Sequence, residues 1–367
     1  MTLPRGFHPF RVQARLDEKP WGGRLLAEFG FPLPHGRLIG EAVITASDSI
    51  VVDGAHAGSK LQDLVSLNPV DTIGKRGLLA TGGRNLFPLL VKVIDAAQTL
   101  SVQVHPDDDR APPGHLGKTE AYHVLRAEAE GRIALGLEPG VSAVEFATAC
   151  RAGDGATNRL LRWLPAIPGE TILIPAGTVH ALGGGCVVYE VQQQSDVTYR
   201  FDDGGRRDAD GNRRQLHVDD GLRVLDIESR PEPIAPILLS TGECRRSLLA
   251  ACRYLALEKL DLEAGARAVI FASDGLNVVT LLAGAAHVKA SHGGVELVAG
   301  ETAIIPAAVD AYIIHAHHST TLLRVWIPDL RNDVVEAGRA AGAKDEQIMS
   351  LAGALPDLRQ QVDEPAL

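Results

Sequence analysis

Several features that would restrict the class of protein are scarce or missing in this sequence. Aromatic residues make up only 4% of its 367 residues, so the core has to be built mainly from Val, Leu, Ile and Ala. No apolar run approaches the ~20 residues that a membrane-spanning helix needs, and we therefore expect no membrane partner. The N-terminal segment MTLPRGFHPFRVQ lacks the basic-then-apolar layout of a signal peptide, which predicts a cytoplasmic protein.

Cysteine and positive charge are also scarce. The four cysteines are scattered without a C-x-x-C pair, so we expect reduced, mostly buried thiols rather than a disulfide framework or a zinc knuckle. The formal net charge is −10, and no basic stripe with interleaved aromatic residues is present, which argues against a nucleic-acid partner. A few local Lys and Arg residues could still bind an anionic metabolite.

Short, β-branched segments bounded by Gly, Pro or Asp dominate the chain, and this pattern is typical of strands. Strands are predicted at 41–46, 87–95, 99–105, 132–137, 170–176 and 186–193, and again at 253–262, 268–273, 277–284, 301–307 and 320–327. Helical periodicity is limited to 61–67, 142–152, 157–164 and the tail from about Asn332. The sequence therefore predicts a mainly β protein, a sandwich or barrel with a few inserted helices.

The segment SRPEPIAPI at 229–237 is the best candidate linker, because its three prolines forbid a continuous helix or a central strand. We expect a first domain over 1–228, a second over 238–330 and a helical tail over 331–367.

An internal similarity supports a duplicated β unit. PGETILIPAGTVHAL (168–182) and AGETAIIPAAVDAYI (299–313) share a G-E-T-x-x-I-P-A core, and His180 of the first copy aligns with Ala311 of the second. Two related barrels are predicted, of which only the first has kept its imidazole. A chance match of two strand–turn–strand patterns is the alternative.

Two segments carry candidate metal ligands. In LSVQVHPDD (100–108), Gln103 and His105 are two residues apart on a strand and so face the same way. The pattern G-x5-P-x-G-x2-H, which ends at His180, is similar to the second motif of the cupin barrel family, whose His binds a metal; Q-x-H followed by Glu120 is similar to the first motif. Zn²⁺ suits such N and O ligands, as do Mn, Fe and Co. Otherwise these would be hydrogen-bonded structural residues.

The sequence resembles the type I phosphomannose isomerases, in particular their short bacterial form. The segments that carry the resemblance are EKPWGG (18–23), FPLLVKVIDAAQTLSVQVHPDD (87–108), GKTEAYHVL (117–125), IPAGTVHALGGG (174–185) and EVQQQSDVTYRFDD (190–203). They lie within residues 15 to 225; the C-terminal region is less similar, and the tail extends beyond the short form.

This resemblance implies two cupin-like (jelly-roll) β-barrels, the first catalytic and the second, over 238–330, degenerate. It implies one Zn²⁺ per chain, held by Gln103, His105, Glu120 and His180, and a hexose 6-phosphate substrate. The implied reaction is the reversible interconversion of mannose 6-phosphate and fructose 6-phosphate through an enediol-type proton transfer. A monomer or homodimer is expected.

The resemblance also implies roles for five further residues. Arg200 would stabilise enediolate charge or bind phosphate, with a surface salt bridge as the alternative. Glu190 would act as an acid or base, or orient a ligand or Arg200. Lys92 would contact substrate or phosphate, and Lys118 and Ser101 would bind phosphate, although Ser101 could equally be a plain strand residue.

Two other readings of the function stay open. The chain could isomerise another sugar, either an unphosphorylated one or a related sugar phosphate, or it could be a non-catalytic cupin that binds metal or sugar. HAHH (315–318) has metal-like spacing but no acidic or thiol partner nearby, which favours a solvated loop or edge strand, and DDDR (107–110) is predicted to form a polar turn.

Overall fold

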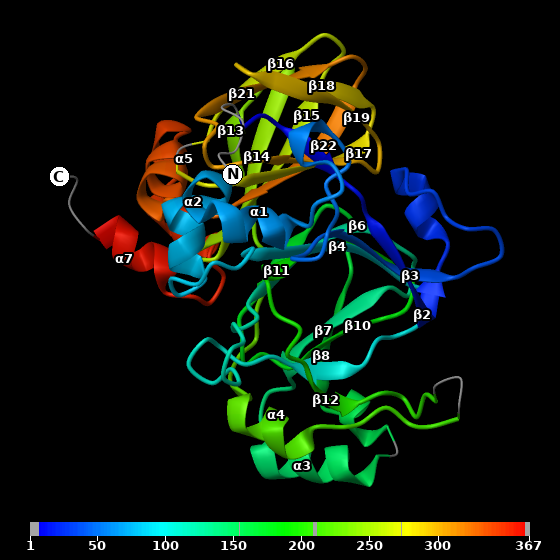
Figure 1. Ribbon diagram of the computed structural model, residues 1–367. Helices are drawn as coiled ribbons and strands as arrows, with labels where there is room; N and C mark the ends of the chain where they lie inside the picture. The colour runs from blue at the N-terminus through cyan, green and yellow to red at the C-terminus, as the bar shows by residue number, and fades with distance from the viewer. Residues whose placement is uncertain (1–6, 154, 208–210, 273, 364–367) are drawn as a thin grey trace.

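Two pairs of antiparallel β-sheets form most of the protein, as seen in a computed structural model that describes residues 7–153, 155–207, 211–272 and 274–363. Each pair encloses its own apolar core, so each is a barrel of the cupin, or jelly-roll, type (Figure 1). This confirms the predicted mainly β fold with two cupin-like barrels. In the described part of the chain, no helix has the length and apolar character needed to cross a membrane.

The first barrel contains a six-stranded and a five-stranded sheet. In spatial order the six strands are β2 (Arg15–Gly23), β3 (Ile39–Thr45), β4 (Leu89–Ala96), β11 (Cys186–Gln193), β6 (Glu120–Ala127) and β9 (Thr171–Ile174). The five are β12 (Tyr199–Asp202), β5 (Val102–Val104), β10 (His180–Leu182), β7 (Arg132–Leu137) and β8 (Leu161–Pro165). Side chains such as Ile94, Tyr122 and Leu135 fill the space between these sheets.

The second barrel has a seven-stranded and a four-stranded sheet. The seven are β1 (Phe10–Val12), β20 (Thr302–Ile305), β17 (Asn277–Ala283), β22 (Thr320–Trp326), β15 (Leu255–Leu262), β14 (Cys244–Cys252) and β13 (Ile237–Ser240). The four are β16 (Arg267–Phe271), β21 (Ala311–Ala316), β18 (Ala285–Ala290) and β19 (Gly293–Val298). The N-terminal strand β1 thus belongs to the second barrel, where it pairs with β20.

The two barrels pack sheet against sheet. Alternate residues of β4, such as Val91 and Val93, point out of the first barrel and join a core shared with Leu257 and Val325 of the second. The residues between them in sequence, including Lys92, point into the first barrel, as the two-residue period of a strand requires. The six-stranded sheet is therefore covered on both faces. Its inward polar residues are buried, and burial of polar groups costs free energy unless they are paired or bind a ligand.

Helices cover the outside of the barrels (Figure 1). Those packed on the five-stranded sheet are α3 (Ala143–Ala152) and α4 (Val218–Val224). The remaining helical segments are α1 (Leu61–Leu67), α2 (Pro69–Ala80), α5 (Ala337–Ala340), α6 (Asp345–Ser350) and α7 (Asp357–Asp363). The described residues also form three short 3₁₀ segments, η1 (Leu25–Phe29), η2 (Gly54–His56) and η3 (Ala156–Arg159), and the π-helix η4 (Leu330–Glu336).

Most predicted elements match the structure within a few residues, and one does not. The helix predicted at 157–164 is wrong, because only Ala156–Arg159 is helical and Leu161–Pro165 forms strand β8. An edge strand paired with β7 offers Leu161 the burial that the helical pattern had suggested. Ser273, at the end of the predicted strand 268–273, lies outside the described residues. The domain division at 229–237 stays a prediction.

The predicted duplication has a structural counterpart. In the first copy β9 begins at Thr171 and β10 at His180, while in the second β20 begins at Thr302 and β21 at Ala311. In each copy the first strand lies in one sheet of its barrel and the second strand in the facing sheet. His180 and Ala311 therefore occupy corresponding positions at the start of corresponding strands.

Candidate functional site

Two rows of polar side chains face each other inside the first barrel. On the six-stranded sheet, Glu190 of β11 is paired directly with Lys92 of β4 on one side and with Tyr122 of β6 on the other. On the five-stranded sheet, Gln103 of β5 is paired with His180 of β10 and with Arg200 of β12. Because paired residues share a face of their sheet, strand register alone gathers these side chains in the barrel interior.

The deepest part of the site is a buried group formed by His105, Glu120 and His180. Their ligand-type atoms all lie within 4.8 Å of one another. The Nε2 atom of His180 is 3.0 Å from Oε1 of Glu120, and Nε2 of His105 is 3.6 Å from Oε2. The structure also places Gln103 here, with its Nε2 atom 3.2 Å from Nε2 of His180. Rotation of this amide would exchange its nitrogen and oxygen.

Hydrogen bonds on the far side of each imidazole fix its tautomer. Nδ1 of His105 donates to the carbonyl of Val197 at 2.9 Å, and Nδ1 of His180 donates to the carbonyl of Thr178 at 3.0 Å. When these imidazoles are neutral, both Nε2 atoms carry lone pairs, and both face the carboxylate of Glu120. Several acceptor atoms therefore lie close together, with the Lys118 ammonium and the Gln103 amide as donors beside them, and a bound metal cation satisfies such a set of acceptors.

The protonation states suit a metal site as well. Burial, reinforced by the Lys118 ammonium, holds the pKa of His105 well below its usual range, so this imidazole is neutral. Burial would raise the pKa of Glu120, but the positive charge of the nearby Lys118 ammonium opposes it, and this pKa lies well below the ordinary value. Neither oxygen of Glu120 receives a hydrogen bond of good geometry from the described residues. The residues present therefore fit a divalent cation.

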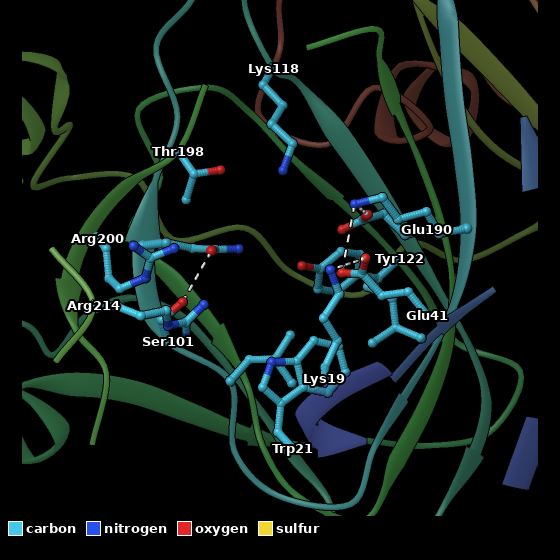
Figure 2. Close-up of a pocket in the computed structure, with 14 residues that line it drawn as sticks. Lys19, Trp21, Glu41, Ser101, Lys118, Tyr122, Glu190, Thr198, Arg200 and Arg214 are labelled. Atoms are coloured by element: carbon cyan, nitrogen blue, oxygen red, sulfur yellow. Dashed lines mark hydrogen bonds and ion pairs between the residues drawn. The ribbon is translucent and has the colours of Figure 1, made fainter. Parts of the chain in front are cut away.

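Above this group lies a cavity of about 190 Å³ that is open to the outside. Five cationic and two anionic side chains line it (Figure 2). The lining consists of Lys19, Trp21, Glu41, Lys92, Ile94, Leu100, Ser101, Gln103, Lys118, Tyr122, Glu190, Thr198, Arg200 and Arg214. A cavity with this excess of positive charge favours an anionic ligand, even though the whole chain carries a charge of −10.

One wall of the cavity holds an alternating row of charges. The Nζ atom of Lys19 lies 3.1 Å from Oε2 of Glu41. The Nζ atom of Lys92 lies 3.9 Å from Oε1 of Glu41 and 3.4 Å from Oε2 of Glu190. Burial would lower the pKa of Lys92, but Glu190 and Glu41 outweigh it and raise this pKa, so the ammonium stays charged. Burial, together with Glu120 and Glu41, raises the pKa of Glu190 despite Lys92.

The opposite wall carries Ser101 and Arg200 (Figure 2). Ser101 is buried, and its hydroxyl donates to the side-chain oxygen of Gln103 at 3.4 Å. Arg200 donates through Nη1 to the carbonyl of Gln215 at 3.1 Å, while its buried Nε atom has no hydrogen-bond partner among the described residues. Burial lowers its pKa from the ordinary value. In the described structure Arg200 forms no ion pair, so the salt-bridge alternative does not explain it.

Lys118 stands between the buried group and the cavity. Its ammonium lies 3.0 Å from Nε2 of His105 and 3.0 Å from Oε2 of Glu120. The structure thus brings all nine predicted site residues to one place, although their individual roles stay predictions.

Sequence reasoning missed several residues that line the cavity. Lys19 and Trp21 lie in EKPWGG, and Glu41 is the lone charge in the strand EAVITA, so a signal existed for each. Tyr122 is two residues from Glu120 and shares its face of β6. Thr198 and Arg214 lie in connecting segments, where nothing in the sequence distinguishes them.

The HAHH segment is only partly as expected. His315 lies in β21, which is an inner strand of its sheet rather than an edge. The expectation that no acidic group is near was wrong, because Nε2 of His317 lies 2.8 Å from Oε2 of Glu296. Both residues of that pair are well exposed, in contrast to the buried group of the first barrel.

The fold and the buried group define a two-barrel cupin with a candidate metal centre in its first barrel. Residues 9–145 match the model of the family described as phosphomannose isomerase type I, catalytic domain. The chain belongs to the type I phosphomannose isomerase family.

Similarity to individual proteins extends over most of the chain. It is 34% identical to the mannose-6-phosphate isomerase ManA of Bacillus subtilis over 272 residues, which cover 72% of this chain and 81% of the relative. It is 32% identical to the mannose-6-phosphate isomerase of Streptococcus mutans, with 83% and 94% covered. The crystal structure of mannose 6-phosphate isomerase from Bacillus subtilis superposes with a TM-score of 0.76 at 27% identity, covering 86% of this chain and 99% of that one.

Proposed function

We propose that this chain is a zinc-dependent mannose-6-phosphate isomerase that interconverts mannose 6-phosphate and fructose 6-phosphate. The observation that carries the proposal is the fully buried group of His105, Glu120 and His180 beside a cavity lined with cations. The relatives named above are mannose-6-phosphate isomerases, and the chain belongs to the type I phosphomannose isomerase family. A carboxylate-and-imidazole centre under an anion-binding cavity is what an isomerase of phosphorylated sugars needs.

One Zn²⁺ per chain would be held by Gln103, His105, Glu120 and His180. Zinc accepts this mixture of nitrogen and oxygen ligands, and Mn, Fe or Co would fit the same set. When bound, such a cation supplies Lewis-acid polarisation of the carbonyl and hydroxyl oxygens, which makes the neighbouring C–H more acidic. The carbonyls of Val197 and Thr178 keep the two imidazoles in the orientation required.

The side chains around the cavity would divide the remaining work. Lys118, Lys92 and Ser101 would bind the phosphate, since they present two ammonium groups and a hydroxyl to the cavity. Arg200 would stabilise the developing enediolate or bind phosphate, and its unpaired Nε atom leaves a donor for either task.

Glu190 would move the proton between C1 and C2 of the sugar. Its carboxylate is 2% exposed, and its Oε2 atom receives no hydrogen bond from the described residues. The raised pKa of this group brings it closer to the range in which a carboxylate can both take and return a proton. Glu190 and Arg200 lie on opposite walls in Figure 2, which argues against a role in orienting Arg200.

The two alternatives are less well supported. An unphosphorylated sugar would offer no anionic group to the excess of cationic side chains around the cavity, where Arg200 forms no ion pair in the described structure. A non-catalytic cupin that only held the metal would not need Glu190, a second buried carboxylate whose Oε2 atom receives no hydrogen bond from the described residues. We also propose a cytoplasmic location and a monomer or homodimer in solution.

A coupled assay tests the proposal directly. Fructose 6-phosphate formed from mannose 6-phosphate is followed by NADPH production after further isomerisation and oxidation by auxiliary enzymes. We expect turnover that a chelator removes and zinc restores, and His180→Ala should lose activity and bound zinc together. The surface variant His317→Ala is the matched control and should keep both. Turnover that survives chelation would refute the metal requirement, and no turnover by the zinc-loaded chain would refute the activity.

A further inference from the structure

The segment that carries Lys118 and Glu120 folds back onto the segment that follows His105. The amide of Lys118 donates to the carbonyl of Pro106 at 2.9 Å. Gly117 lies against the next peptide so closely that a Cβ atom there would be 2.6 Å from the carbonyl carbon of Asp107 and 2.6 Å from the nitrogen of Asp108. The positions of two proposed metal ligands, His105 and Glu120, and of Lys118 therefore depend on how these two segments are held together.

Asp108 and Gln193 hold the two segments together on both sides of Lys118. Oδ1 of Asp108 accepts hydrogen bonds from the amide of Gly117 at 2.8 Å and from Nε2 of Gln193 at 3.1 Å. The side-chain oxygen of Gln193 in turn accepts from the amide of Thr119 at 2.9 Å. Residues 117 and 119, which flank Lys118 in sequence, are thus fixed through one carboxylate and one amide.

The other oxygen of Asp108 is bound by the second barrel. Tyr254, in the turn between β14 and β15, donates its hydroxyl to Oδ2 of Asp108 at 2.6 Å. That turn is itself held by the C-terminal tail, because the amide of Arg253 donates to Oδ2 of Asp357 in α7 at 2.8 Å. A continuous line of hydrogen bonds runs from the tail through the second barrel to the metal-site segment of the first.

We propose that Tyr254 is a positioning residue for the metal centre, acting through Asp108, and that the second barrel and α7 support the site in this way. The inference rests on the proposed metal site and extends it to residues outside the first barrel. A short hydrogen bond to a carboxylate is charge-assisted and fixes the orientation of that carboxylate. Asp108 can then hold Gly117 and Gln193 in one geometry. These two residues in turn fix the position of the segment that carries Lys118 and Glu120. Groups that hydrogen-bond a metal ligand directly commonly alter metal affinity about 10- to 100-fold when they are lost. Tyr254 acts through more bonds than that, so we expect an effect at the lower end of this range.

The experiment removes one oxygen atom at a time. Tyr254→Phe deletes the hydroxyl that reaches Asp108, and Tyr312→Phe is the matched control, because its hydroxyl is also in the second barrel but donates to Asn277 at 3.2 Å. Zinc-loaded proteins are mixed with a chromophoric chelator at a temperature well below their unfolding transitions, and the rate of zinc release is followed. We expect release to be about tenfold faster in Tyr254→Phe and unchanged in Tyr312→Phe. Equal release rates in Tyr254→Phe and wild type would overturn the inference, as would equal acceleration in both variants.

Two further variants separate positioning from a general loss of stability. Asp108→Ala should also release zinc faster, and the double variant with Tyr254→Phe should be no faster than Asp108→Ala alone, because both act through one path. Additive effects would contradict that path. Asp357→Asn, which keeps an oxygen acceptor for Arg253, should behave like wild type, whereas Asp357→Ala should release zinc faster.

Wild-type behaviour distinguishes this inference from the proposed function. A wild-type chain that holds zinc without isomerising mannose 6-phosphate would overturn the activity alone, and the release rates would still decide the role of Tyr254. A wild-type chain that holds no zinc would overturn both.

Discussion

Acid should weaken the contact between the two barrels through His123. This residue lies on the outward face of β6, is 3% exposed, and its Nδ1 atom is 2.8 Å from the hydroxyl of Thr171. Burial, with a smaller contribution from the Lys259 ammonium of the second barrel, lowers the pKa of His123 to about 4 from the ordinary 6.5. The imidazole is therefore neutral in the folded protein over a range of pH in which it is protonated once unfolded.

The sign and size of the effect follow from that difference. A lowered folded-state pKa means that the unfolded chain binds the proton more tightly, so stability is lost as the pH falls from about 6.5 to about 4. The gap of about 2.5 between the two pKa values corresponds to about 3 kcal/mol of unfolding free energy, with nearly all of it lost by pH 4. Above pH 7 His123 is neutral in both the folded and the unfolded chain, so its contribution to the free energy of unfolding should no longer change with pH.

Denaturant unfolding between pH 4 and pH 8 measures this contribution. His123→Asn keeps an acceptor near the position of Nδ1 but cannot be protonated, so its stability should fall less steeply below pH 6.5 than that of wild type. His35→Asn, at an exposed position, is the control and should leave the steepness unchanged. If His123→Asn and wild type lose stability in parallel over this interval, the assignment of the acid sensitivity to His123 is refuted.

Three further predictions concern the site and the thiols. Lys92→Met should lower kcat/KM about 100-fold and move the acid limb of the pH–rate profile upward, because the ammonium 3.4 Å from Glu190 no longer lowers the pKa of that carboxyl. Arg200→Lys should raise KM or lower kcat by about tenfold with little change in Tm, since an ammonium cannot replace the planar fork; unchanged steady-state kinetics would contradict this. Thiol reagents should react slowly with the native protein, whereas after denaturation they should modify four thiols quickly. The reason is that burial raises the pKa of Cys150 to about 12, that of Cys186 to about 11 and that of Cys252 to about 12.

Two local rules explain how the sequence could predict part of the candidate site. Strand periodicity puts Gln103 and His105 on one face, and the Gly- and Pro-defined turn before His180 sets the start of β10. Neither rule says which strands meet. The direct pairing of Gln103 with His180 joins residues 77 positions apart and depends on the closure of the barrel.

What the sequence could not predict depends on contacts between distant segments. The helical pattern at 157–164 was misleading because the burial of Leu161 comes from β7, which no local window contains. The hydrogen bonds of Asp108 to Gln193 and Tyr254 could not be predicted for the same reason. In sequence Asp108 belongs to an acidic turn, and Tyr254 is 146 residues away. Polar residues at loop ends acquire their partners only when the barrels dock.

The pairing of β1 with β20 sets the order in which this protein can be completed. Arg11 of β1 contacts Glu301, 290 residues further along the chain, so the edge of the seven-stranded sheet stays open until residue 305 has been synthesised. Bringing together two strands this far apart in sequence costs conformational entropy, and only the contacts of the formed sheet offset that cost. We therefore expect the pairing of β1 with β20 to be a late and slow step of folding. Until then the edge of β1 that pairs with β20 has no partner, and an unpaired strand edge is a surface through which two unfinished chains can pair with one another.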